Sequence, residues 1–160
     1  MHLVIIIKYI MRKTYLLLLL CLAPGLFASN ADDLISEMKK KAVSGDTPSQ
    51  YKLGEAYKEG ILVSKDYAES RKWFLMASDY GVAAARWEIG IMYLKGEGVP
   101  MDYVESYAWF NLSVAGGYEF ARQFRDGTAK RLMTPEQVAR GQSRSTELFK
   151  EIEAKREKRK

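Results

Sequence analysis

Residues 85–121 read ARWEIGIMYLKGEGVPMDYVESYAWFNLSVAGGYEFA, and they repeat, without a gap, the pattern of residues 49–85, SQYKLGEAYKEGILVSKDYAESRKWFLMASDYGVAAA. Twelve of the 37 aligned positions are identical, whereas typical residue frequencies would give about two or three. The identical residues lie 36 positions apart, in the pairs Gly54/Gly90, Tyr57/Tyr93, Gly60/Gly96, Val63/Val99, Asp66/Asp102, Tyr67/Tyr103, Glu69/Glu105, Ser70/Ser106, Trp73/Trp109, Phe74/Phe110, Gly81/Gly117 and Ala85/Ala121. Repeats of this period are typical of stacked supersecondary units.

Each unit predicts a helix, a turn and a second helix. Apolar residues recur at helical spacing in the first half of each unit, at Tyr51, Leu53, Ala56 and Tyr57 and at Trp87, Ile89, Met92 and Tyr93. Gly60 and Gly96 predict the end of the first helix, because glycine adopts the left-handed conformation at low cost. Asp66 and Asp102 predict the start of the second helix, because aspartate accepts hydrogen bonds from the free N–H groups there.

Gly54 and Gly90 lie inside the expected first helices, where glycine costs about 1 kcal/mol relative to alanine. Because glycine recurs at the same position of both units despite this cost, we expect a close contact there between the two helices of each hairpin. Trp73 and Trp109 then fill the space around that contact. One hairpin cannot cover its own apolar faces, so we expect stacked hairpins that cover one another in an all-α fold.

The strings LGEAYKEG (53–60) and IGIMYLKGEGVPMDYVESYAWFNLSVAGG (89–117) resemble the Sel1-like repeat, A-x-x-x-L-G-x-x-Y-x-x-G-x-G-V-x-x-D followed by A-x-x-W-[FY]-x-x-A-A-x-x-G. The resemblance covers about residues 45–126. It implies a short α/α solenoid of Sel1-like helical hairpins, related to tetratricopeptide arrays. It also implies a protein–protein interaction scaffold, and many members of the family are exported by bacteria.

The chain departs from the family pattern at several positions. Leu62 stands where the second turn glycine belongs, and Ser70 and Ser106 replace the usual alanine. Arg125-Asp126 replaces the third Leu-Gly pair, so the third unit is incomplete. We therefore expect a repeat array over residues 29–133, with full units at about 49–84 and 85–120.

The flanks of the array are expected to be capping helices. Residues 32–43 resemble a lone second helix, and a helix reaching about Leu132 opens the incomplete third unit. Thr134-Pro135-Glu136-Gln137 predicts a new helix, because threonine can cap it and Gln137 can complete a capping box. That helix presents Val138, Leu148 and Ile152 on one side, so residues 134–160 are expected to form a C-terminal capping helix with a basic tail.

The N-terminal segment, residues 1–28, is interpreted as a signal peptide, with Met11 as an alternative native start. From Met11 the chain reads MRKTYLLLLLCLAPGLFASNADD: a basic start, an apolar run and small residues that suit cleavage after Ala28 or Ala31. The apolar run of about 14 residues is shorter than the roughly 20 that a spanning helix needs. The prediction is a periplasmic or secreted protein with no integral membrane span after cleavage, and retention of the segment as an anchor stays open.

The chemistry available to the mature chain is limited. The single Cys21 and the single His2 both lie in the signal segment, so no zinc site, disulfide, cysteine nucleophile or histidine triad is expected in the mature protein. The net charge of +5 comes from the two ends of the chain, since residues 29–149 hold 16 basic and 17 acidic residues. A nucleic-acid partner is not expected without a basic body. We assign no catalytic residue, cofactor or metal and expect no enzyme activity.

The residues expected to bind a partner lie on the first helices, which line the inner surface of such a solenoid. They are Glu55, Lys58, Ile91 and Lys95, with Tyr51 and Trp87 at the edge. They differ between units, as a surface that recognises one partner would, although ordinary solvent-facing residues would also differ. The predicted function is an exported, non-enzymatic scaffold for a protein or peptide. The alternatives are an enzyme or regulator associated with peptidoglycan and a secreted effector that binds a host protein. The sequence leaves the oligomeric state undetermined.

Overall fold

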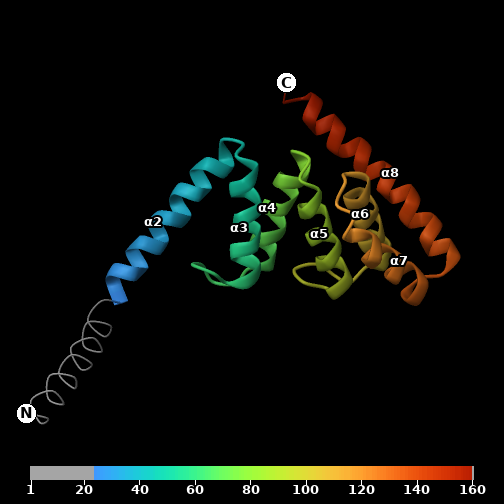
Figure 1. Cartoon of the computed structure of the whole chain (residues 1–160), viewed down its shortest axis with the longest axis horizontal. Coiled ribbons are helices and arrows are strands. Elements are labelled where there is room, and N and C mark those ends of the chain that lie inside the picture. The colour runs from blue at the N-terminus through green and yellow to red at the C-terminus, as the bar shows by residue number, and fades with distance from the viewer. Residues whose placement is uncertain (1–23, 160) are drawn as a thin grey trace, which may run out of the picture.

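The computed structural model describes residues 24–159 of the chain. Within this range the chain forms helices and no β-strand, which confirms the predicted all-α solenoid. The helices are α2 (Pro24–Val43), α3 (Thr47–Glu59), α4 (Tyr67–Asp79), α5 (Ala83–Lys95), α6 (Tyr103–Ala115), α7 (Ala121–Leu132) and α8 (Pro135–Glu157). Figure 1 shows the hairpins α3/α4 and α5/α6 standing side by side between α2 and the long α8.

The turn residues act in both hairpins as the repeat predicts. Gly60 and Gly96 end α3 and α5, and each has a φ of 74°. Asp66 caps α4, with its carboxylate accepting hydrogen bonds from the N–H groups of Ala68 and Glu69 at 2.9 and 3.0 Å. Asp102 caps α6 in the same way. The helix boundaries are therefore set by local capping chemistry that is repeated 36 residues apart.

The two helices of each hairpin approach closely at the helical glycines. A Cβ atom on Gly54 would lie 2.5 Å from the ring of Phe74, and one on Gly90 would lie 2.6 Å from the ring of Phe110. Both rings are fully buried and cannot move aside. The expected close contact is thus confirmed, and the group that requires it is a phenylalanine ring of the second helix.

The serines that replace the family's alanine reinforce this contact. The Ser70 hydroxyl donates a hydrogen bond to the carbonyl of Gly54 at 2.7 Å, and the Ser106 hydroxyl donates one to Gly90 at 2.9 Å. Because both serines are fully buried, each bond also satisfies a hydroxyl that would otherwise be costly inside the protein.

The paired tryptophans point into the core, as the stacking of hairpins requires. Trp73 is 5% exposed and Trp109 is 4% exposed. Trp73 packs with Leu53 of α3 and Ile35 of α2, which joins the first hairpin to α2. Trp109 belongs to a second cluster, which extends from Phe74 to helix α8. The apolar faces are therefore covered by neighbouring elements along the stack.

The turn of the first hairpin contains a strained residue. Leu62 has a φ of 64°, in the left-handed region that costs a residue with a side chain roughly 1–2 kcal/mol. The equivalent residue in the second hairpin, Gly98, has a φ of 71° without that cost. The departure from the family pattern at Leu62 therefore keeps the turn geometry at the expense of stability.

We expect Leu62→Gly to raise the free energy of unfolding by about 0.5–1 kcal/mol, because relief of the backbone strain exceeds the added freedom of the unfolded chain. Urea denaturation of the two proteins measures the difference. Ile61→Gly is the control: it changes a neighbouring exposed residue without positive φ, and it should not stabilise the protein. Equal effects of the two substitutions would contradict the assignment of strain to Leu62.

The N-terminal helix α2 packs against α3 and supplies Ile35 and Ala42 to the core. The predicted signal peptide lies largely outside the described residues, but both predicted cleavage positions fall within α2. After either cut, residues 32–43 would keep the part of α2 that contains Ile35 and Ala42. None of the helices in the described part of the chain is long and apolar enough to cross a membrane.

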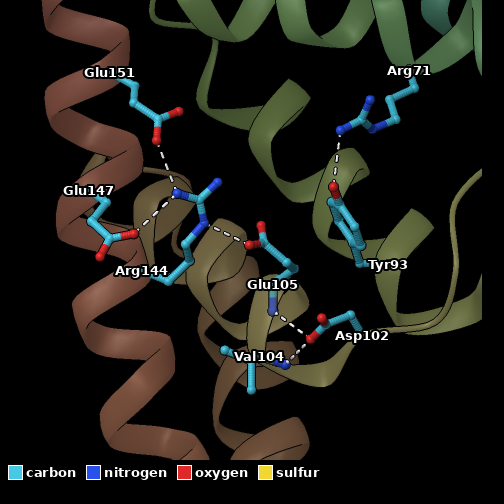
Figure 2. Close-up of polar contacts among 8 residues, drawn as sticks. All are labelled: Arg71, Tyr93, Asp102, Val104, Glu105, Arg144, Glu147 and Glu151. Atoms are coloured by element: carbon cyan, nitrogen blue, oxygen red, sulfur yellow. Dashed lines mark hydrogen bonds and ion pairs between the residues drawn. The ribbon is translucent and has the colours of Figure 1, made fainter.

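The C-terminal helix α8 begins with the predicted capping box, in which Thr134 and Gln137 exchange hydrogen bonds. It packs along α6 and extends to α4, so it lies on the side formed by the second helices. Leu148 and Ile152 are buried there at 4% and 3% exposure, as their shared face predicts. Figure 2 shows Arg144 of α8 reaching Glu105 of α6, with Nε 2.6 Å from Oε1.

Candidate binding surface on the first helices

The first helices α3, α5 and α7 contact one another through side chains on one side of the solenoid, which we call the inner surface. Between α3 and α5, Lys58 Nζ lies 3.0 Å from Glu88 Oε2. Between α5 and α7, the rings of Trp87 and Phe124 lie 5.4 Å apart at 73°. The six residues predicted to bind a partner are all on α3 and α5, and the contacts of Lys58 and Trp87 connect this surface.

The Lys58–Glu88 pair is partly withdrawn from water. The Glu88 side chain is 4% exposed and the Lys58 side chain is 21% exposed. Burial raises the pKa of Glu88 above its ordinary value, and the opposing attraction of Lys58 does not fully compensate. Burial alone would lower the pKa of Lys58, but the carboxylates of Glu88 and Glu59 raise it. Lys58 therefore stays charged, and Glu88 is the member of the pair that resists ionisation.

We expect the stability of the wild-type protein to fall, relative to Glu88→Gln, as the pH rises above about 4.5 toward neutrality. A carboxyl group with a raised pKa binds protons more tightly in the folded state, so ionisation in the unfolded chain begins first and draws the equilibrium toward unfolding. Urea denaturation of both proteins at pH 4 and pH 7 measures the difference. A glutamine variant that loses stability relative to wild type over this range would show that pairing with Lys58 outweighs burial.

Tyr51 and Glu55 lie one helical turn apart on α3. The ring of Tyr51 packs on that of Phe74 at 5.5 Å, so this predicted binding residue is half-buried against the hairpin core. Burial is the main cause that raises the pKa of Tyr51 far above its ordinary value, and the nearby carboxylates of Glu88 and Glu55 add to it. Tyr51 therefore presents a neutral phenol beside an acidic part of the inner surface.

Trp87 is the centre of an aromatic cluster that we define as Trp87, Tyr118, Phe120 and Phe124. The Trp87 ring lies 6.0 Å from Tyr118, 5.6 Å from Phe120 and 5.4 Å from Phe124. These tilted and edge-to-face arrangements are the favourable ones for aromatic rings. Phe120 is 51% exposed although it packs in the cluster, so the cluster offers a large apolar ring to a partner.

Three of the predicted residues line a small cavity at the other end of α3 and α5. Lys58, Ile91 and Lys95 surround a space of about 190 Å³, together with Glu59, Lys65, Tyr67 and Glu97. Ile91 is 7% exposed and mainly forms the floor, so it offers little surface to a partner. The Lys95 side chain is 58% exposed and lies 3.8 Å from Glu97. The rim is therefore formed by charged side chains of both signs.

Sequence reasoning missed Glu88 and the residues Tyr118, Phe120 and Phe124. The three aromatic residues fall within the seven positions 118–124, where the second unit passes into the incomplete third unit, and this density was a signal that they form a surface of their own. Glu88 had no such signal, since its role depends on the position of Lys58 in the preceding unit. Within the described residues, no group of three or more His, Cys, Asp or Glu side chains is placed to hold a metal ion.

Comparisons with known proteins agree with this architecture. The family model described as Sel1 repeat matches residues 47–81 and 83–118. The fold is similar to the crystal structure of a protective antigen of uropathogenic Escherichia coli strains that displays an SLR fold, with a TM-score of 0.68 and 29% identity over 79% of this chain and 28% of that one. It is also similar to a Sel1 repeat protein from Oxalobacter formigenes, with a TM-score of 0.59 and 25% identity over 71% of this chain and 50% of that one.

The chain thus spans at most half the length of these two proteins. No protein of curated function matches it. Sel1 repeats generally mediate contacts between proteins and are typically non-enzymatic scaffolds. The matched repeats coincide with the hairpins α3/α4 and α5/α6, and the glycines, capping aspartates and paired tryptophans of these hairpins are those of the repeat pattern. Residues 47–118 of this chain therefore form two Sel1 repeats.

Proposed function

We propose that this protein is an exported, non-enzymatic scaffold that holds another protein or a peptide against its inner surface. The observation that carries the proposal is the aromatic cluster, whose rings are packed by one another while Phe120 stays half exposed. Large aromatic side chains that are ordered before binding contribute much of the affinity of protein interfaces, since little conformational entropy is lost on contact.

The charged residues near the cluster support recognition of a specific partner. Glu55 and the Lys58–Glu88 pair lie toward α3, and the cavity at Lys95 lies beyond them. Such charges add specificity and steer association more than they add affinity. An extended segment with an apolar anchor for the aromatic cluster and polar groups toward α3 and α5 is the partner that this arrangement favours.

A matched pair of variants tests the proposal. Phe120 and Phe149 are 51% and 50% exposed, but Phe149 lies on α8, outside the inner surface. We expect Phe120→Ala to weaken capture of a cross-linked partner from a cell-envelope extract by about ten-fold or more, and Phe149→Ala to leave it unchanged. Circular dichroism confirms that both variants stay folded. Equal capture by both variants would contradict binding at the aromatic cluster. Turnover of a cell-wall substrate that persists in the Trp87→Ala variant would also contradict the proposed scaffold function.

Export is supported by the basic, apolar and small-residue regions of the N-terminal segment. N-terminal sequencing of the mature protein is expected to return Ser29 or Asp32 as the first residue. A first residue of Met1 or Met11 would show that the segment is retained.

A further inference from the structure

The side of the solenoid opposite the inner surface, formed by the second helices, contains a groove between α4 and α6 that α8 fills. Leu148 and Ile152 of α8 are four residues apart and join the core cluster that contains Trp109. Leu75 of α4 packs against the same cluster. The groove thus accepts one amphipathic helix through an apolar pair at i and i+4 spacing.

Charged side chains hold α8 at both rims of this filled groove. Arg144 bonds Glu105 of α6, and Figure 2 shows that Glu147 and Glu151 of α8 hold the same guanidinium. Near the other end of α8, Arg159 Nη2 lies 3.1 Å from Oδ2 of Asp79, at the end of α4. The filled groove therefore presents the acids Glu105 and Asp79 to the basic residues Arg144 and Arg159.

The repeat predicts an equivalent groove one unit earlier, along α2, which precedes the first hairpin as α4 precedes the second. The space found there is lined by α2 and the first turn, and no residue of α4 lines it. The residues Ile35, Lys39 and Val43 of α2 line an open cavity of about 690 Å³, which Val63 of the first turn also lines. Their counterparts 36 positions later are Arg71, Leu75 and Asp79, which line the smaller cavity of about 200 Å³ left beneath α8. Val43 is 71% exposed, whereas its counterpart Asp79 is 6% exposed under the end of α8.

The repeated tyrosines support the equivalence of the two grooves. Lys39 of α2 lies over the ring of Tyr57, with Nζ 5.4 Å from the ring centroid. Arg71 of α4 lies over the ring of Tyr93 at 5.6 Å and also donates a hydrogen bond to its hydroxyl at 3.0 Å (Figure 2). A cation of the preceding second helix therefore covers each repeated tyrosine, although Lys39 and Arg71 occupy different positions of the repeat, since Lys39 aligns with Leu75.

The two grooves differ in charge at the end where α8 places Arg159. The filled groove has the acid Asp79 there, and the open groove has the apolar Val43 with Lys39 and Lys40 beside it. The acid that lines the open groove, Asp32, lies at the opposite end of the α2 stripe. A helix that binds in the direction taken by α8 must therefore carry acidic residues toward its C-terminal end.

We propose that the open groove along α2 binds an acidic amphipathic helix of a partner protein, with an apolar pair four residues apart in contact with Ile35, Val43 and Val63. A second copy of this chain is a poorer occupant. In the filled groove, Asp79 pairs with Lys155 and with Arg159 of α8. In the open groove, the α8 of a second copy would instead bring these two cations against Lys39 and Lys40. This binding site is separate from the inner surface and does not rest on the function proposed for it.

The probe is a fluorescent peptide of residues 141–159 that carries the substitutions Lys155→Glu and Arg159→Glu. These substitutions give acidic side chains to the end of the peptide that would meet Lys39 and Lys40. Fluorescence anisotropy with the full chain measures its affinity beside that of the unchanged peptide. We expect the acidic peptide to bind about ten-fold more tightly, since two repulsive contacts become attractive. The variant Lys39→Glu/Lys40→Glu should reverse the preference.

Val43→Asp is expected to abolish binding of the acidic peptide without unfolding the protein, because Val43 is exposed. Ile61→Asp is the matched control, since Ile61 is 57% exposed and does not line the cavity. Absence of binding by the acidic peptide would overturn the proposal. Tighter binding of the unchanged peptide would overturn it in favour of a second copy. The peptide could instead displace α8 from its own groove. In that case Glu105→Ala would weaken binding and Val43→Asp would leave it intact, and this result would also overturn the proposal.

Discussion

Trp109→Ala is expected to lower the free energy of unfolding by about 3–5 kcal/mol. Trp109 is 4% exposed and packs in one cluster with Ile89 of α5 and with Leu148 and Ile152 of α8. Removal of the indole leaves a cavity where the second hairpin meets α8, and close-packed neighbours can relax into it only in part. Urea denaturation followed by far-ultraviolet circular dichroism measures the loss.

Phe149→Ala is the control for Trp109→Ala, because Phe149 is a large apolar residue of α8 that is half exposed. Its expected effect is within about 0.5 kcal/mol. If Trp109→Ala proves too unstable to purify, Trp109→Phe keeps an aromatic ring in the site and should cost about 1 kcal/mol. A loss below 1 kcal/mol for the alanine variant would mean that α8 does not cover the indole.

Gly90→Ala is expected to lower the free energy of unfolding by about 1–3 kcal/mol, although alanine is the better helix former by about 1 kcal/mol. The added Cβ would lie 2.6 Å from the ring of Phe110, which is fully buried in the hairpin. Either the ring or the second helix must shift, and the shift also lengthens the hydrogen bond from Ser106 to the carbonyl of Gly90. Thermal and urea denaturation measure the effect.

Gly127→Ala is a matched control in helix α7. A Cβ there would meet only the end of the Arg131 side chain, at 2.9 Å, and that flexible group can move aside. We therefore expect Gly127→Ala to stabilise the protein by about 0.5–1 kcal/mol. The double variant Gly90→Ala/Phe110→Leu should recover part of the loss, because the smaller side chain makes room for the methyl group. Stabilisation by Gly90→Ala alone would contradict the close contact within the hairpin.

The hairpins could be predicted because the residues that define them act over short distances. Asp66 and Asp102 bond N–H groups two and three residues ahead, and Gly60 ends its helix through its own backbone conformation. The glycine–phenylalanine contact was predictable in part. The repeated glycine indicated a close approach, but it did not identify Phe74 as the group that fills the space.

The binding surface was less predictable. The phase of the first helices selected Tyr51, Glu55, Lys58, Trp87, Ile91 and Lys95, and their role in binding stays a prediction. Ile91 is mostly covered. The partners that give this surface its character come from other units. Glu88 lies 30 residues from Lys58, and Phe124 lies 37 residues from Trp87 in a unit whose pattern is broken.

By itself, the sequence determined the all-α class, the 36-residue unit and the ends of the repeat helices, since capping groups and apolar spacing act within a few residues of each other. Only the tertiary structure decided the path of α8 across α6 to α4, the meeting of Trp87 with Phe120 and Phe124, and the open groove beside α2. These features depend on how helices from different units are inclined to one another. That inclination results from side-chain packing along the whole stack, which no local pattern encodes.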